Sequence, residues 1–421
     1  MIEPLIPITR KQALLFAGFL VLYEFLVYIA NDMIMPGMLS VIHTFHAPKS
    51  AVATSLTAYI LGGASLQLLL GPISDRYGRR PVMLFGVAWF VVATLMIPWA
   101  QTITQFLIVR FLEGMGLCYI NVVGYALLQE IFNEKDAIRM VAVMVNVAIL
   151  APLFGPLAGA EFLELGMGGW HAIFYWISGL SVVALLGLYY TMPESVGQMK
   201  RDGQIIRRQA LTIATILHNY QTLLTHRVFV FGTLAYGLMG MICIIWIALS
   251  PVILITLSKC TLVQYGLWQL PVFGAFILGN IILSNLTKYY KVVQLSLIGS
   301  LSVFAGSLLL CGIPWLAGYT AKGMMPGLVV YSIGYGLGAT ALNRFILFVT
   351  QVSTGTTSAL LFTVSLCFQA FGNEIGNYVF TRYDLKTLIY YLGLIGMLHI
   401  VCVAVSLYHH QRTQVLGLEH L

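Results

Sequence analysis

Apolar stretches of 20 or more residues recur along the whole chain, separated by short polar connectors. A helix needs about 20 apolar residues to cross a bilayer, so each stretch is long enough to form a span. With 59% hydrophobic and only 9% charged residues, the chain has too few polar groups for a soluble globule. We therefore predict an all-α polytopic membrane protein. Its twelve predicted spans cover residues 14–39, 51–72, 81–100, 104–128, 137–160, 170–191, 228–257, 264–287, 292–316, 324–350, 355–380 and 386–408.

The longest polar connector, residues 192–227, divides the predicted spans into six and six. A central linker between equal halves is typical of the duplicated architecture of secondary transporters. Within the linker, residues 205–224 have a helical apolar period with basic residues at one end, so they could lie along the membrane surface. The predicted organisation is a six-helix bundle at 1–191, a linker at 192–227, a second six-helix bundle at 228–408 and a tail at 409–421.

Lysine and arginine are sorted by side of the membrane. If the N-terminus is cytoplasmic, fifteen of them fall in inside segments and five in outside segments. An excess of basic residues marks cytoplasmic loops, so both termini are predicted to be cytoplasmic. The same sorting explains the isoelectric point near 9.0 without a nucleic-acid partner. The first apolar run is too long for a signal peptide and lacks a small-residue cleavage site, so we interpret it as the first span.

The first span carries two carboxylates, Glu24 and Asp32, inside its apolar zone. Each costs about 2.5–3.5 kcal/mol at the depth of the hydrocarbon core, so such groups normally face a bundle interior, a partner or water. They lie about 80° apart around a helix and roughly 12 Å apart along it, with Tyr28 and Asn31 on the same side. Acids in such surroundings can hold a proton at neutral pH and release it to a cation. Alternatively, Asp32 faces headgroups and Glu24 is a neutral core acid.

Residues 71–81, GPISDRYGRRP, connect the second and third spans and mix glycine, proline, aspartate and arginine. Glycine allows close packing and a tight turn, and proline marks helix ends. An aspartate among arginines can make charge-assisted bonds to neighbouring helix ends. A basic loop that only sets topology would explain the arginines but not the mixture. The candidate residues are Gly71, Asp75, Arg76, Gly78, Arg79, Arg80 and, near the inner end of the fourth span, Glu130 as a partner for the arginines.

The fourth span contains Arg110, at about the depth expected for Asp32. A buried guanidinium without an acid partner or water is strongly unfavourable, so a partner must be near. Glu113 lies three residues on and can neutralise it along the same helix. Two interpretations stay open: the pair is purely structural, or Arg110 biases the protonation of Asp32 or Glu24.

The fifth span combines Pro152 and Pro156, which each remove a backbone hydrogen bond, with Gly155 and Gly159, which let another helix approach closely. This pattern predicts a kinked helix with a glycine face at the interface between the two halves. A plain packing kink is the alternative.

In the second half, Arg344 and Glu374 are the only charged residues within the tenth and eleventh spans. They could pair across the bundle, either to bind substrate or to hold the half together. The six cysteines form no close-spaced pair typical of a zinc site or disulfide framework. The chain also has no H-E-x-x-H helix, nucleophile elbow or phosphate-binding loop, so we expect no metal, no cofactor, no enzyme and no ATP-driven pump.

Residues 71–81 resemble the signature of the major facilitator superfamily between its second and third helices. The glycine and proline spacing of the fifth span resembles the superfamily's antiporter motif in part, since Ala160 stands where the fullest motif has a second glycine. With the paired acids of the first span, RFLEGMGLCYINVVGY at 110–125 and YGLWQLPVFGAFILGN at 265–280, the chain resembles the MdfA/Cmr-like bacterial multidrug–proton antiporters. The resemblance runs from about residue 12 to the last helix.

The resemblance implies the major facilitator fold, with residues 71–81 acting as a latch between the halves on the cytoplasmic side. It also implies that Glu24 and Asp32 exchange protons and meet substrate, and that Arg110 is the central arginine of proton coupling. One departure is Glu113, which stands where we expect a glutamine and adds a third acid near the proton site. The residues implied to contact substrate are Glu24, Tyr28, Asn31, Asp32, Tyr125, Met144 and Ala148.

The expected function is proton-driven export of lipophilic drugs, cationic or neutral and chloramphenicol-like, across the bacterial inner membrane by alternating access. A largely apolar cavity would explain broad specificity, because burial of apolar surface is non-directional. The expected partners are small lipophilic molecules, protons and the lipid bilayer, and we expect a monomer. The nearest alternative is a dedicated proton-coupled exporter of one metabolite, such as a siderophore. A proton symporter and a membrane enzyme or receptor are further alternatives.

Overall fold

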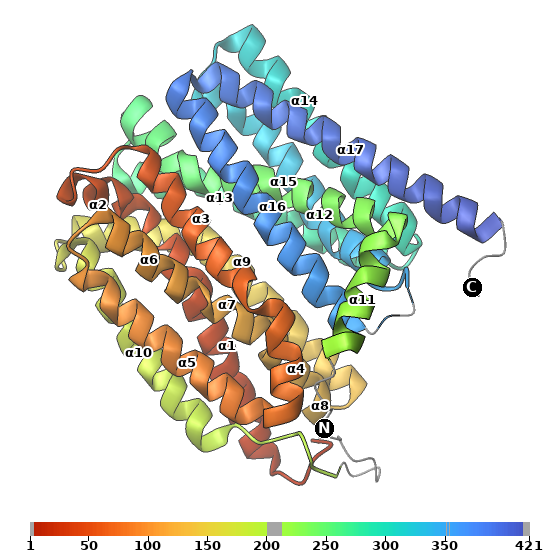
Figure 1. Cartoon of the computed structure of the whole chain (residues 1–421). Coiled ribbons are helices and arrows are strands. Elements are labelled where there is room, and N and C mark those ends of the chain that lie inside the picture. Colours follow the sequence, from red (N-terminus) through yellow and green to blue (C-terminus); the bar gives the residue numbers. More distant parts are fainter. Residues whose placement is uncertain (1–3, 200–212, 351, 353, 416–421) are drawn as a thin grey trace. The chain divides into compact units, whose positions relative to one another are not determined.

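The computed structural model describes residues 4–199, 213–350, 352 and 354–415 (Figure 1). This part of the chain contains twelve helical segments long and apolar enough to cross a membrane, which confirms the predicted all-α architecture. Most predicted bounds lie within a few residues of the observed ones; the sixth span, for example, is Gly169–Thr191. Contacts divide the chain into two compact units, Met1–Ala51 with Ala58–Ile213 and Val52–Thr57 with Ala214–Leu421. The predicted domain limits themselves stay a prediction.

The first six spans are built from ten α-helices and three short segments of other helical type. They are α1 (Arg10–Asp32), η1 (Met35–Gly37), α2 (Met38–Thr44), α3 (Ser50–Ser65), α4 (Gln67–Tyr77), α5 (Arg79–Met96), η2 (Ile97–Trp99), α6 (Ile103–Gly114), α7 (Gly116–Tyr119), η3 (Ile120–Gly124), α8 (Tyr125–Ile131), α9 (Glu134–Glu164) and α10 (Gly169–Thr191).

The second half holds a helix from the predicted linker, α11, and then six spans. The elements are α11 (Ile213–Thr225), α12 (Arg227–Pro251), η4 (Val252–Leu257), α13 (Leu262–Leu286), α14 (Val292–Ala317), α15 (Ala321–Leu347), α16 (Thr354–Arg382) and α17 (Leu385–Val415). Of the predicted surface helix at 205–224, the described residues begin at 213 and are helical. Leu217 and Leu224 expose much of their surface on α11, and its position on a membrane stays a prediction.

Capping side chains explain where several of these helices begin. Thr9 accepts a hydrogen bond from the backbone of Gln12 at the start of α1, and Thr102 does the same for α6. Asn133 caps α9, and Thr261 forms a reciprocal capping box with Gln264 on α13. The side-chain oxygens satisfy backbone N–H groups that would otherwise have no partner in the first helical turn.

Glycines bring the long helix α9 against the end of α1. A Cβ atom on Gly159 would lie only 1.9 Å from the carbonyl oxygen of Met33, and one on Gly155 would lie 2.8 Å from Cβ of Asp32. No larger residue fits at Gly159 without moving the two helices apart. The α9 helix continues through Pro152 and Pro156. This close packing, characteristic of small residues in membrane helices, holds the Asp32 end of α1 in place.

Backbone contact also joins α14 and α15 in the second unit. A Cβ on Gly299 would lie 2.3 Å from Cα of Gly338, and one on Gly306 would lie 2.3 Å from the backbone nitrogen of Tyr331. Because lipid tails are as apolar as the helix surfaces, such close packing replaces the hydrophobic effect as the attraction between spans.

The crossing of α1 and α9 leads to a stability prediction. Gly159→Val should lower the unfolding temperature in detergent, because overpacking a close contact costs about 1–3 kcal/mol or more. Gly179→Val is the matched control, since Gly179 lies within α10 and a Cβ atom there would have no neighbouring atom within 4 Å. Equal losses in the two variants would contradict the steric explanation.

Candidate functional site

The two acids of α1 are both buried. Glu24 exposes none of its surface and Asp32 exposes 5%. The burial of Asp32 argues against the alternative in which it faces the headgroups. Because a buried carboxylate is costly in the membrane interior, the surroundings of each acid decide what it can do.

Glu24 receives one hydrogen bond and leaves one oxygen uncompensated. The hydroxyl of Tyr125 donates to its Oε1 at 2.7 Å. Its Oε2 is buried and has no hydrogen-bond partner among the described residues. Tyr125 begins α8 directly after the π-helical turn η3, and such turns are frequent at functional sites. An unsatisfied buried oxygen of this kind is suited to a proton or a cationic ligand.

A buried ion pair joins Arg110 to Glu113 within α6, and both side chains are fully buried. The other oxygen of Glu113, Oε1, accepts a hydrogen bond from the Thr94 hydroxyl at 3.0 Å. The guanidinium of Arg110 also lies 4.5 Å from the centroid of the Tyr59 ring. The acid partner expected for Arg110 is therefore present, and both of its oxygens are bound.

Asn31 connects this ion pair to Asp32. Arg110 Nη2 donates to Asn31 Oδ1 at 2.7 Å, and Asn31 Nδ2 donates to Asp32 Oδ1 at 3.2 Å. The amide thus accepts from the cation and donates to the acid. A polar chain results, from Glu113 through Arg110 and Asn31 to Asp32, and it crosses from α6 to α1.

Three other residues are implied by the resemblance to line a cavity. The structure gives their position and burial, but no contact that bears on substrate binding. Tyr28 is half-buried on α1 between Glu24 and Asp32. Met144 is buried and Ala148 half-buried, one turn apart on α9. Their contact with substrate stays a prediction.

Thr94 and Tyr59 belong to the site and were missed by sequence reasoning. Thr94 lies on α5 and Tyr59 on α3, each as one ordinary residue in an apolar run. Gly114 lets α6 approach the backbone of α3 at Tyr59: a Cβ atom on Gly114 would lie 2.0 Å from the carbonyl oxygen of Tyr59. Only the packing of three helices makes either residue recognisable.

The motif at 71–81 forms a charged network at the junction of α4 and α5. Arg79 Nη2 lies 2.6 Å from Asp75 Oδ1 and 2.9 Å from Glu130 Oε1. Ser195 donates to the second oxygen of Glu130. The expected pairing of Glu130 with an arginine is present, whereas latch action between the halves stays a prediction. A Cβ atom on Gly71 would lie 3.8 Å from Cγ1 of Val122, an ordinary contact, and Arg76 is exposed.

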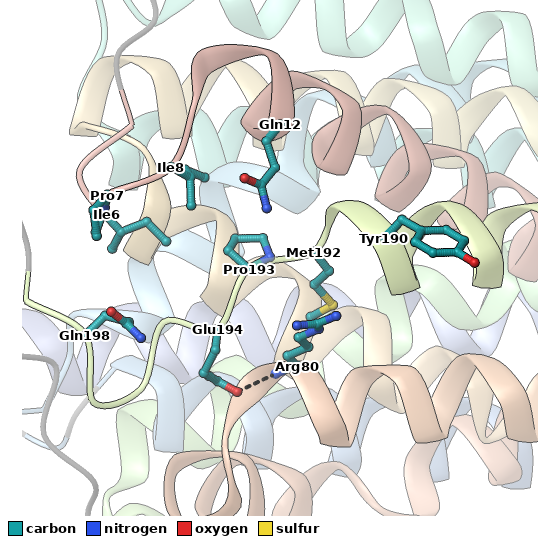
Figure 2. A pocket seen from close by; sticks show the side chains of 10 residues that line it. All are labelled: Ile6, Pro7, Ile8, Gln12, Arg80, Tyr190, Met192, Pro193, Glu194 and Gln198. Carbon is teal, nitrogen blue, oxygen red and sulfur yellow. Dashed lines mark hydrogen bonds between the residues drawn. The ribbon is translucent and has the colours of Figure 1, made fainter.

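Glu194 anchors this network and was not selected from the sequence. Its carboxylate accepts hydrogen bonds from the backbone nitrogens of Arg79 at 2.9 Å and Arg80 at 3.1 Å, and from those of the two residues that follow it. Gly78 has a φ of +109°, and a Cβ there would lie 2.4 Å from Glu194 Oε2. Figure 2 shows Glu194 beside Arg80 at a pocket of about 310 Å³. The acid caps the start of α5 from a distant part of the sequence, which no local pattern indicates.

The two charges of the second half do not meet. Arg344 lies in the last turn of α15, with its guanidinium 5.8 Å from the centroid of the Phe348 ring. Glu374 Oε2 accepts a hydrogen bond from Asn377 at 3.5 Å. Within the described ranges no ion pair joins Arg344 to Glu374, so the pairing that the sequence left possible is not formed in this structure. The two residues sit near different parts of their spans.

The polar chain predicts coupled stabilities for Glu113 and Asp32. Glu113→Gln leaves Arg110 without its ion-pair partner, and Asp32, reached through Asn31, becomes the acid left to balance the charge. The double variant Glu113→Gln/Asp32→Asn should therefore lose more unfolding temperature than the sum of the single variants, because an unbalanced buried charge costs about 3–5 kcal/mol. Additive losses would show that Asp32 and Arg110 do not sense each other.

The cap at the start of α5 gives a second prediction. Glu194→Gln removes the charge that four backbone N–H groups share, and it should lower stability by about 1–2 kcal/mol. Glu164→Gln, at an exposed carboxylate in the last turn of α9, is the control and should leave the unfolding temperature unchanged. An unchanged melting curve for Glu194→Gln would contradict the capping role.

Comparisons with known proteins place the chain in a family. The model of the Major Facilitator Superfamily matches residues 20–373. The multidrug transporter MdfA of Yersinia pestis bv. Antiqua (strain Angola) is 40% identical over 399 residues, 92% of this chain and 95% of that protein. The multidrug transporter MdfA of Escherichia coli O157:H7 is 40% identical over 392 residues, 91% and 93% of the two chains. That of Edwardsiella ictaluri is 42% identical over 368 residues, 87% of each.

Solved structures support the fold at low sequence identity. An inward-facing bacterial homologue of the human lysosomal transporter Spinster matches with a TM-score of 0.71 at 12% identity, covering 94% of this chain and 97% of that one. A D-xylose–proton symporter matches with a TM-score of 0.69 at 17% identity, covering 92% and 97%. The chain belongs to the major facilitator superfamily and, within it, to the family of the MdfA multidrug transporters.

Proposed function

We propose that this chain is a proton-driven exporter of lipophilic drugs in the bacterial inner membrane. The observation that carries the proposal is the pair of buried acids on α1 with different surroundings. Asp32 is tied through Asn31 to Arg110, whereas Glu24 has one oxygen bound by Tyr125 and one without a partner. The names of the relatives, which are 40–42% identical, support multidrug transport.

The different surroundings suggest a division of labour between the two acids. Glu113 already balances the charge of Arg110, so an ionised Asp32 would add an uncompensated negative charge to a buried cluster. Asp32 is thus the proton carrier in this proposal, and it gives up its proton only when Arg110 turns toward it or a cation arrives. Glu24 is the acid that meets cationic drugs, because its free oxygen lacks a donor.

Substrate and proton then compete for one region, and the competition drives exchange. A drug that enters from the cytoplasmic side displaces a proton, and a proton from outside resets the carrier. Neutral drugs bind through apolar burial alone, and cationic drugs gain from Glu24 in addition. The glycine contact of α9 with the Asp32 end of α1 offers a path by which a change at Asp32 reaches a second helix.

The test uses proteoliposomes that contain a pH dye, with tetraphenylphosphonium and then chloramphenicol as substrates. Wild type should move protons with both drugs, and Asp32→Asn should with neither. Glu24→Gln should lose about tenfold in apparent affinity for the cation, which corresponds to about 1.4 kcal/mol, and keep its response to chloramphenicol. Glu164→Gln, whose carboxylate is exposed at the end of α9, is the matched control.

Two outcomes would contradict the proposal. No proton movement with any drug, from folded wild-type protein, would reject multidrug exchange and favour a dedicated exporter of one metabolite. Drug movement in the same direction as an imposed proton gradient would indicate symport.

A further inference from the structure

A second pocket lies at one end of the second unit, where α15 and α17 end and α14 begins. Its volume is about 370 Å³. Three candidate spans have an end here, since one begins at Val292, one ends at Leu347 and one ends at Arg412. The pocket is lined by Val292, Arg344, Phe345, Phe348, Val349 and His410.

The lining combines two basic side chains with an apolar wall. The guanidinium of Arg344 lies 5.8 Å from the centroid of the Phe348 ring, and the ring of His410 packs edge-on against Phe345 at 5.0 Å. No aspartate or glutamate lines the pocket within the described part of the chain. The C-terminus of α15 carries partial negative charge, which helps to hold Arg344 at that position.

His226 lies near His410 at this end of the unit, and its environment favours the neutral ring. His226 precedes α12, outside the candidate span, and burial followed by the nearby His410 lowers its pKa. The charge that an anion in the pocket would meet is that of Arg344, with His410 on α17 beside it.

We propose that this pocket binds the phosphate headgroup of an anionic phospholipid. The phosphate contacts Arg344 and His410, and one acyl chain follows the apolar wall toward the bilayer. Arginine is well matched to phosphate, and basic pockets between spans at the membrane boundary are suited to anionic headgroups. A soluble phosphate ester shares the phosphate chemistry but gains nothing from the wall of Phe345, Phe348 and Val349. The proposal does not rest on the transport function.

The experiment measures lipid retention on the full chain in detergent by native mass spectrometry. Phosphatidylglycerol and phosphatidylcholine with identical acyl chains are titrated in parallel, and inorganic phosphate is the competitor. Wild type should retain phosphatidylglycerol about fivefold more tightly than phosphatidylcholine, as one basic contact allows. Arg344→Gln should remove this preference, Arg344→Lys should keep part of it, and phosphate should not displace the lipid.

Lys322→Gln is the matched control. Lys322 is an exposed cation in the first turn of the same helix α15, so its removal changes the net charge equally but lies at the opposite end of the span. The variant should bind both lipids as wild type does. His410→Gln is a second variant in the pocket, and it should weaken phosphatidylglycerol binding without changing that of phosphatidylcholine.

Three outcomes would overturn the proposal. The first is equal retention of the two lipids by wild type. The second is an equal effect of Arg344→Gln and Lys322→Gln, or an unaltered preference in His410→Gln if Arg344→Gln does not fold. The third is displacement of phosphatidylglycerol by millimolar phosphate, which would assign the pocket to soluble phosphate esters.

Discussion

The buried ion pair of Arg110 and Glu113 is the interaction on which the arrangement of the first unit depends. Neither charge could stay in the membrane interior alone, because desolvation costs several kcal/mol for each ion. The pair holds α6 in register with α5 through Thr94, and with α1 through Asn31. Since the charge of Arg110 is already balanced, Asp32 is connected to the cation without being its counter-ion.

Close approach of backbones makes this arrangement possible. Gly114 lets α6 approach the backbone of α3, and Gly155 and Gly159 let α9 approach the end of α1. Within this packing Asn31 connects Arg110 on α6 with Asp32 on α1. The same principle joins α14 to α15 in the second unit, where no comparable ion pair is found within the described residues. Small residues here replace the hydrophobic drive that helices lack in lipid.

At residues 71–81, between α4 and α5, charged groups are again paired with one another or with helix ends. Asp75 and Glu130 share Arg79, while Glu194 caps the first turn of α5. Gly78 permits both the positive φ and the close approach of the Glu194 carboxylate. Every charged group in the network but the exposed Arg76 thus satisfies a helix end or another charge, so the motif is a compact structural joint as well as a candidate moving part.

Much of this could be predicted from the sequence, and the physical reason is the bilayer. A helix must satisfy its own backbone in hydrocarbon, so the length of an apolar run alone predicts each span, and the rarity of charges inside a span makes Glu24, Asp32, Arg110 and Glu113 stand out. The pairing of Arg110 with Glu113 also followed, because the two lie three residues apart on one helix.

Tertiary structure decided which distant residues meet. Asn31 as a connector, Thr94 and Tyr59 around the ion pair, and Glu194 as a cap all depend on contacts between helices that are far apart in the sequence. Arg344 and Glu374, which the sequence allowed to pair, form no ion pair within the described residues for the same reason: charge complementarity shows that two residues can pair, but not that their helices bring them together. The twelve spans and the rarity of charges within them follow from the sequence because exposing polar groups to lipid is costly, whereas the partners that come from other helices follow only from helix packing.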